Sequence, residues 1–209
     1  MPAPKAKTRL LLLRHAEVEE RYQCVFGGRL DMDLSPRGQE QARQLADYLR
    51  GTPVDALYVS PLRRARQTAL PLTRQNGHQP IAAEGLREVD FGAWTGLTWD
   101  EVKERFGVSP YHWLRELHQG TIPGAEPATE FAARVGACLR DALAAQPGGT
   151  VAMLCHGGVV RMLLAILLDL PLPRMSAFEV DYASLTVVEQ HRRGAEIQLL
   201  NFTPWRRSW

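Results

Sequence analysis

Cationic and imidazole side chains follow three short apolar runs of the sequence. They are Arg14 and His15 after the first run, Arg63 and Arg64 after the second, and His156 after the third. Apolar runs of this length are typical of strands buried on both faces of a parallel sheet. Ligands of such sheets bind beyond the carboxyl ends of the strands. We therefore expect these side chains to gather along one edge of a sheet.

A phosphoryl group is the ligand that this set of side chains favours. Crowding several cations is electrostatically unfavourable unless an anion lies among them. Guanidinium groups match phosphate oxygens with paired, charge-assisted hydrogen bonds, so Arg14 and Arg64 could hold such a group. An unprotonated His15 could then attack phosphorus, which divides one difficult displacement into two easier covalent steps. The departing oxygen needs a proton, so we also expect a carboxylic acid nearby.

The elements that must position these residues alternate between strand and helix. Ser35 and Pro36 are typical of a helix start, and Gly51 is typical of a helix end. We expect buried strands at residues 9–13, 56–59 and 151–155, and a hairpin from residues 184–189 and 196–200. We expect helices at residues 36–50, from the second strand to residue 70, at residues 99–106 and 130–143, and after Gly158. This order predicts an α/β fold, a three-layer α/β/α sandwich with a mostly parallel central sheet, formed by residues 1–209 as one domain.

Four short motifs follow one another between residues 14 and 158. They are Arg14-His15 followed by Glu17; Ser60-Pro61-Leu62-Arg63-Arg64-Ala65 with Gln67-Thr68-Ala69; Leu86-Arg87-Glu88 before Phe91-Gly92; and His156-Gly157-Gly158. In this order the chain resembles the histidine phosphatase superfamily, the phosphoglycerate-mutase-like group, from about residue 9 to residue 168. An Arg-His pair alone would be weak evidence, whereas four motifs in order are specific.

The resemblance implies a role for each matching residue. His15 would be the nucleophile that forms a phosphohistidine, and Glu88 would donate the proton and later act as base for the attacking water. Arg14, Arg64 and His156 would bind the phosphoryl group. The resemblance implies no metal and no other cofactor, because these cations take over the charge neutralisation that magnesium supplies elsewhere.

The chain also departs from the family pattern just after His15. The family commonly has Gly, Thr and Asn where this sequence has Ala16, Val18 and Arg21. A polar contact to phosphate is therefore missing or supplied differently, and Arg21 is the candidate to replace it.

Composition limits the partners and the location of the protein. In 209 residues, Lys and Arg number 25 against 23 Asp and Glu, a net charge of +2 that does not favour general binding to nucleic acid. Three widely spaced cysteines exclude a disulfide framework and a cysteine zinc cluster, and they fit a reducing cytoplasm. The leucines at residues 10–13 are too short a run for a secretory signal, and residues 162–168 are too short to span a bilayer. We expect a cytoplasmic protein that binds a small phosphate ester and neither nucleic acid nor membrane; its oligomeric state stays open.

Three functions are compatible with these residues. The first is a phosphomonoesterase, the second a phosphoglycerate mutase, and the third a non-catalytic protein that binds a phosphorylated ligand. The last is disfavoured, since a binding protein would not need both His15 and Glu88. The resemblance implies a longer insertion in the mutases than the 68 positions from Glu88 to His156, so we favour the phosphatase.

Alpha-ribazole phosphatases are the members that the chain resembles most, which implies a place in cobalamin assembly. The features are Glu88 to Gly92, Tyr111-His112-Trp113, and the tail from Phe178 through Asn201 to Trp205. A broad-specificity or sugar-phosphate phosphatase is the alternative. Trp94 and Trp113 follow Glu88 closely, and either could line a substrate pocket.

Overall fold

A mixed, mostly parallel sheet of six strands lies at the centre of the computed structural model, which describes residues 7–77 and 79–206. The strand order is β3-β2-β4-β1-β5-β6. The strands are β1 (Thr8–Arg14), β2 (Ala56–Val59), β3 (Ile81–Ala82), β4 (Thr150–Cys155), β5 (Leu185–His191) and β6 (Gly194–Phe202). The first four run parallel, β5 runs antiparallel to β1, and β6 pairs with β5 as a hairpin. The predicted α/β fold is confirmed, and it is phosphoglycerate-mutase-like.

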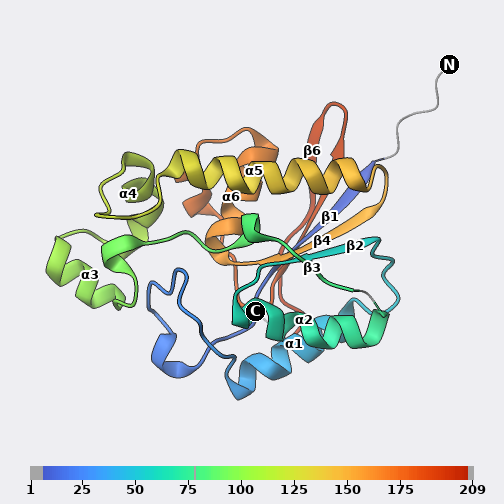
Figure 1. The fold of residues 1–209 in the computed structure, drawn as a ribbon, viewed down its shortest axis with the longest axis horizontal. Helices are drawn as coiled ribbons and strands as arrows, with labels where there is room; N and C mark the ends of the chain where they lie inside the picture. The colour runs from blue at the N-terminus through green and yellow to red at the C-terminus, as the bar shows by residue number, and fades with distance from the viewer. Residues whose placement is uncertain (1–6, 78, 207–209) are drawn as a thin grey trace.

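Helices cover both faces of this sheet (Figure 1). They are α1 (Pro36–Tyr48), α2 (Arg63–Asn76), α3 (Trp99–Phe106), α4 (Trp113–Gln119), α5 (Ala128–Ala145) and α6 (Gly157–Leu168). Helices α1 and α2 pack on one face, and α5 and α6 on the other. Ser35 caps α1 as predicted, because its side chain accepts a hydrogen bond from the Gly38 amide.

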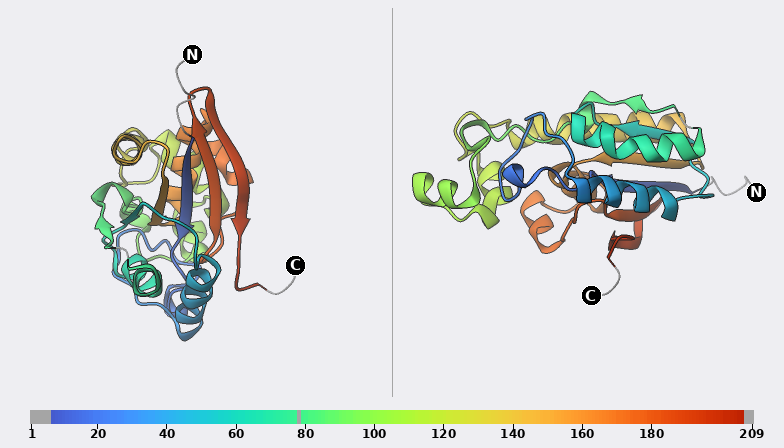
Figure 2. Two further views of the ribbon diagram at one scale, coloured as in Figure 1. Left: turned by 90° about the vertical axis from the view of Figure 1, so that its right-hand side faces the viewer. Right: turned by 90° about the horizontal axis from the view of Figure 1, so that it is seen from below.

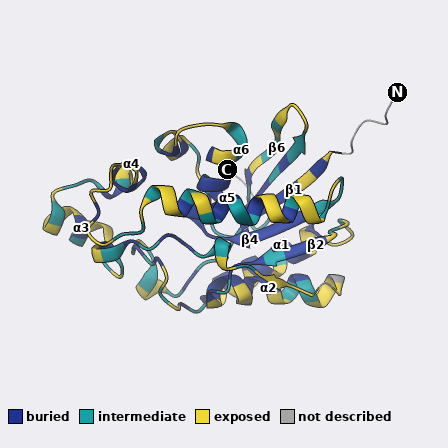
Figure 3. Cartoon of the chain, turned by 45° about the horizontal axis from the view of Figure 1, so that its top comes forward, coloured by how far each residue is buried: buried dark blue, intermediate teal, exposed yellow. Residues whose placement is uncertain are grey.

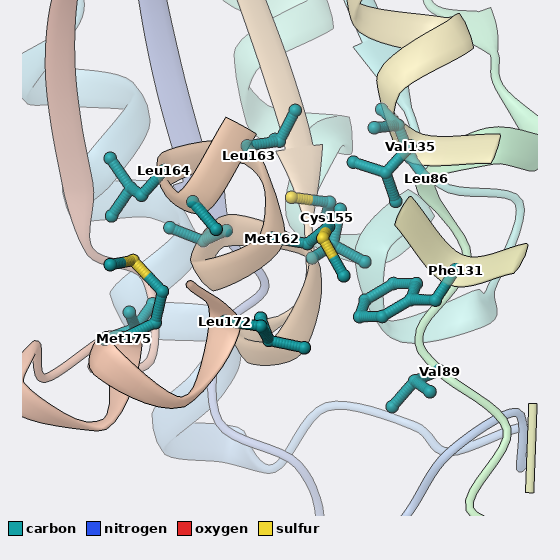
Figure 4. Packing of buried hydrophobic residues seen from close by; sticks show 14 of the residues in the cluster. Leu86, Val89, Phe131, Val135, Cys155, Met162, Leu163, Leu164, Leu172 and Met175 are labelled. Atoms are coloured by element: carbon teal, nitrogen blue, oxygen red, sulfur yellow. The ribbon is translucent and has the colours of Figure 1, made fainter. Parts of the chain in front are cut away.

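The apolar run of β1 serves both cores because successive strand side chains point to opposite faces. Leu10 and Leu12 join the core under α5 and α6, whereas Leu11 and Leu13 join the core under α1 and α2. Dark, buried segments therefore line both sides of the sheet in Figure 3. Figure 4 shows the first of these cores, in which Phe131 and Met162 lie near Cys155 of β4.

Most predicted elements are present, with three differences. The helix that we expected to end at residue 70 continues through Pro71 to Asn76, and Leu72 in that extension is buried. The short strand β3 and the helix α4 were not predicted. Strand β3 has only two residues, both of them exposed, and two residues are too short an apolar run to predict a strand.

The strand order brings the predicted site residues together. Strand β4 lies between β1 and β2, and Arg14 at the end of β1 is in register with Cys155 at the end of β4. His15 and His156 follow these two positions, so they are neighbours across the sheet. Helices α3 and α4 lie beyond this carboxyl edge (Figures 1 and 2).

Residues 1–6, 78 and 207–209, which belong to the domain expected over residues 1–209, lie outside the residues that the structure describes. Within the described residues, no helix has both the length and the apolar character to cross a membrane.

Candidate active site

His15 lies just past the end of β1 and is 5% exposed. Its Nδ1 lies 2.8 Å from the Ala16 carbonyl oxygen, an acceptor, so Nδ1 carries the proton. The lone pair therefore lies on Nε2, which accepts a hydrogen bond of 3.2 Å from Arg64 Nε. Burial, and then the charges of Arg64 and Arg14, hold the pKa of His15 well below 6.5. This imidazole is neutral at pH 7, and its unprotonated Nε2 lies beside Arg64 in the pocket lining.

His156 lies at the end of β4, directly before α6, and is fully buried. Its Nδ1 accepts a hydrogen bond of 3.2 Å from Arg64 Nε, and its Nε2 lies 2.7 Å from Ser60 Oγ. The network therefore places the proton on Nε2, which donates to Ser60. Burial lowers the pKa of His156 well below 6.5, and the charge of Arg64 adds to this effect. The two imidazole rings lie 5.1 Å apart between centroids.

Arg64, in the first turn of α2, connects both histidines. Its Nε lies 3.2 Å from each ring, and its two Nη atoms donate to the carbonyl oxygens of Leu30 (2.8 Å) and Gly28 (2.7 Å). The side chain is 2% exposed, and burial lowers its pKa to about 10. It stays charged at pH 7 and fixes the loop before α1 against the site.

Arg14 approaches the same point from β1. Its Nη1 donates to the Val180 carbonyl oxygen at 2.6 Å, and its guanidinium carbon lies 4.0 Å from the centre of the Tyr182 ring. Its Nε is buried and has no hydrogen-bond partner among the residues that the structure describes. An anion between Arg14, Arg64 and the histidines would supply that partner.

Glu88 reaches the site from the loop after β3 and is 9% exposed. One carboxylate oxygen accepts from the Gly158 amide at 3.1 Å, and the other accepts from the Val89 amide at 3.0 Å. A Cβ on Gly158 would stand only 2.4 Å from Glu88 Oε1 and 3.2 Å from the Trp113 ring. The second glycine of the His156 motif is therefore required for Glu88 to reach the first turn of α6.

Arg134 of α5 holds the loop that carries Glu88. Its Nη1 donates to the carbonyl oxygens of Gly85 (2.9 Å) and Arg87 (2.7 Å), and its Nη2 donates to that of Glu88 (3.2 Å). Glu126 accepts from the same guanidinium at 2.6 and 2.8 Å. Three backbone acceptors on one side chain fix where Glu88 enters the site.

The pocket above these residues has a volume of about 410 Å³, far more than a phosphoryl group fills. Its outer part is largely aromatic. The rings that line it are those of Tyr22, Phe26, Phe91, Trp99, Tyr111, Trp113, Phe178 and Tyr182. Tyr111 is 70% exposed and packs edge-on against Trp99, with 5.2 Å between ring centres. The site therefore has a cationic floor and an aromatic mouth.

Comparison with known proteins agrees with this arrangement. The family model of the histidine phosphatase superfamily (branch 1) matches residues 10–203. The chain belongs to the histidine phosphatase superfamily. As a member of this family it is a phosphatase.

Relatives within the superfamily differ in what their names say they act on. The chain is 32% identical over 195 residues to phosphoserine phosphatase 1 of Hydrogenobacter thermophilus, covering 93% of this chain and 92% of that protein. The structure of a mycobacterial glucosyl-3-phosphoglycerate phosphatase superimposes with a TM-score of 0.81 at 27% identity, covering 93% of this chain and 99% of that one. The alpha-ribazole phosphatase of Shigella flexneri gives 0.81 at 26%, covering 93% and 96%.

The structure brings together the family residues His15, Arg14, Arg64, Glu88 and His156, and it does not bring Arg21 to them. Arg21 lies in the short helix η1 (Glu20–Tyr22), 69% exposed by side chain, and pairs with Glu19 at 2.7 Å. It does not line the pocket, so the contact that we expected from it has no support here. Trp113 lines the pocket, whereas Trp94 is buried in the core. Arg63 is about half exposed and pairs with Asp33 at 3.0 Å, as expected of a surface residue.

Sequence reasoning assigned no role to Ser60, Arg134 or Arg161. Ser60 is the first residue of the motif that runs from Ser60 to Ala65, and its place directly after β2 was the signal that could have indicated a hydrogen-bond partner for His156. Arg161 comes one helical turn after Gly157 and lines the pocket. Residues four apart share a helix face, so this spacing could have indicated that Arg161 lies on the same side of the helix as Gly157. Arg134 is 46 positions from Glu88, and nothing in the sequence links the two.

Proposed function

We propose that the protein hydrolyses small-molecule phosphomonoesters through a phosphohistidine on His15. The observation that carries this proposal is the neutral His15 ring in the pocket lining, whose unprotonated Nε2 accepts from Arg64 while its Nδ1–H donates to the Ala16 carbonyl oxygen. Attack by Nε2 forms the N–P bond as the bond from phosphorus to the ester oxygen breaks. Glu88 gives its proton to the departing oxygen.

The second half of the reaction returns the enzyme to its starting state. Glu88, now ionised, accepts a proton from a water molecule whose oxygen attacks phosphorus. The N–P bond breaks, the electron pair returns to His15 Nε2, and inorganic phosphate leaves. Arg14 and Arg64 bind the phosphoryl oxygens throughout, and guanidinium groups suit the charge that develops on them. His156 joins them only when its Nδ1 carries a proton, since its Nε2–H donates to Ser60.

Hydrolysis is favoured over a mutase reaction by the segment between Glu88 and His156. This segment supplies α3, η4 (Pro110–His112) and α4, from which Trp99, Tyr111 and Trp113 line the pocket, and the exposure of Trp99 and Tyr111 supports an open mouth. An open mouth would give water access to the phosphohistidine. A mutase must instead keep the intermediate and return the phosphoryl group to it.

Alpha-ribazole phosphate is a candidate substrate because its planar base could stack on the exposed Trp99 and Tyr111 rings. Assignment to cobalamin assembly rests on this candidate. A sugar-phosphate ester is the second candidate, since a sugar ring can pack against the same faces. The names of relatives add two esters whose leaving groups carry a carboxylate, phosphoserine and glucosyl-3-phosphoglycerate.

Release of inorganic phosphate from a panel of these esters, with a chelator present, tests the proposal. We expect release that the chelator does not slow, because the proposed site neutralises charge with its own arginines, and we expect none from His15→Ala. Isomerisation of phosphoglycerate without net phosphate release would favour the mutase. Loss of activity on chelation that magnesium restores would also contradict the mechanism.

A further inference from the structure

Arg161 is a partly buried cation in the pocket to which the proposed mechanism gives no role. It lies in the second turn of α6, and its guanidinium lines the pocket beside Gly157 and Gly158. Its Nη1 donates to the Gly157 carbonyl oxygen at 3.2 Å. Its Nε is a buried atom that has no hydrogen-bond partner among the described residues, and no carboxylate of those residues forms an ion pair with the guanidinium.

Arg14 is the cation that lies beside Arg161 in the pocket. A Cβ built on Gly157 would stand 3.3 Å from Arg161 Nη1 and 3.5 Å from Arg14 Nε, so both guanidinium groups pack against the same glycine. Burial, and then the charge of Arg14, lower the pKa of Arg161 to about 10, which leaves both groups charged at pH 7. Two neighbouring, partly buried cations are unfavourable without an anion in hydrogen-bond contact with them.

The phosphoryl group does not account for Arg161. That group would lie over His15, between Arg14 and Arg64. Arg161 bonds to the Gly157 carbonyl oxygen, and the amide of the next residue, Gly158, donates to Glu88 at 3.1 Å. Glu88 is the group that would protonate the departing oxygen, so Arg161 lies on the leaving-group side of the site.

We propose that Arg161 binds a carboxylate on the leaving group, so that the preferred substrate is the phosphate ester of a hydroxy acid. The edge formed by Nε and Nη2 makes no hydrogen bond to any described residue, and this edge matches a carboxylate with two parallel bonds. This inference rests on the proposed function and selects among its substrates. It ranks an ester with a carboxylate near the phosphate above alpha-ribazole phosphate, whose leaving group has none.

A matched pair of esters tests the assignment. O-Phosphoserine and O-phosphoethanolamine differ only by the carboxylate, and the wild-type protein should prefer phosphoserine in kcat/KM. Arg161→Gln should lower kcat/KM for phosphoserine on the order of 10- to 100-fold, the range of a hydrogen bond to a charged group. It should change kcat/KM for phosphoethanolamine less than about threefold, and Arg161→Lys should recover part of the loss.

Arg174→Gln is the control, since Arg174 is an exposed arginine of the neighbouring helix η5 (Leu172–Ala177) outside the pocket lining. It should leave the preference unchanged. Equal losses for both esters in a folded Arg161→Gln protein would overturn the inference, because Arg161 would then serve the phosphoryl group or Glu88. A wild-type preference for phosphoethanolamine or alpha-ribazole phosphate would overturn it without any variant. Absence of phosphate release from every ester would instead refute the proposed function.

Discussion

The protonation state of two histidines decides what the site can do. His15 must have its lone pair on Nε2, and the Ala16 carbonyl oxygen ensures this by accepting a hydrogen bond from Nδ1–H, which keeps the proton on Nδ1. His156 is oriented the other way, with Nδ1 toward Arg64 and Nε2–H toward Ser60. A single serine therefore sets the tautomer of the second histidine.

Ser60→Ala should weaken both activity and stability. The change leaves the Nε2–H of His156 buried without a partner, which costs about 1–3 kcal/mol of unfolding free energy. It also lets the proton move to Nδ1, where it would point at Arg64. We expect at least a tenfold lower kcat/KM, about the effect of one lost hydrogen bond, and altered ¹⁵N shifts of the ring. Ser109→Ala, at a serine whose side chain makes no capping bond, should match wild type. An unchanged ring spectrum in Ser60→Ala would show that another group holds His156.

At the level of elements, the ends of β1 and β4 and the first turn of α2 place the proposed phosphoryl-binding residues, whereas α5 fixes the loop that carries the proposed acid. Glu88 lies on a loop, and Arg134 of α5 binds three carbonyl oxygens of residues 85–88. The position of Glu88 is therefore fixed by a side chain of α5, which packs against the loop.

Arg134→Met should lower kcat more than it raises KM. Without these hydrogen bonds the Glu88 carboxylate should shift, and a displacement of up to about 1 Å costs on the order of 10- to 100-fold in rate. The loss should be large for esters of alkyl alcohols, whose oxygen needs a proton, and small for a nitrophenyl ester. Arg140→Met, at an exposed arginine of the same helix, is the control. Equal losses for the two kinds of ester would mean that Arg134 stabilises the fold without positioning Glu88.

Strands β1, β2 and β4 and the family residues that follow them could be predicted from local sequence, whereas β3 was not predicted and Glu88 was assigned only through the family resemblance. Buried apolar runs identify β1, β2 and β4, and the residues after them are at the carboxyl edge in any parallel arrangement. The path of residues 15–34 could not be predicted in this way. It depends on distant contacts, such as the bridges of Val18 to Leu34 and of Val25 to Thr98, which leave Arg21 outside the pocket. Arg134 escaped prediction for the same reason.

For the whole molecule, the two buried histidines make stability depend on pH. The pKa of each is lowered well below 6.5 in the folded protein, so the unfolded chain binds more protons below about pH 6.5. Unfolding free energy should therefore be greatest above this pH and fall as the pH drops, by up to about 1.4 kcal/mol per pH unit for each histidine.

Denaturant unfolding between pH 7.5 and 5 measures this slope. His156→Gln removes one of the two groups and should flatten the slope, whereas His118→Gln, at an exposed histidine, should not. Parallel slopes for wild type and His156→Gln would mean that His156 is protonated in the folded protein.

Single-turnover rapid quench with a ³²P-labelled phosphate ester tests the central claim most directly. We expect acid-labile, alkali-stable phosphate on the protein, up to one per chain, which forms before inorganic phosphate and decays as phosphate is released. The label should map to His15 and be absent from His15→Ala. Formation of inorganic phosphate with no protein-bound phosphate at any time, or equal labelling of His15→Ala, would contradict the account.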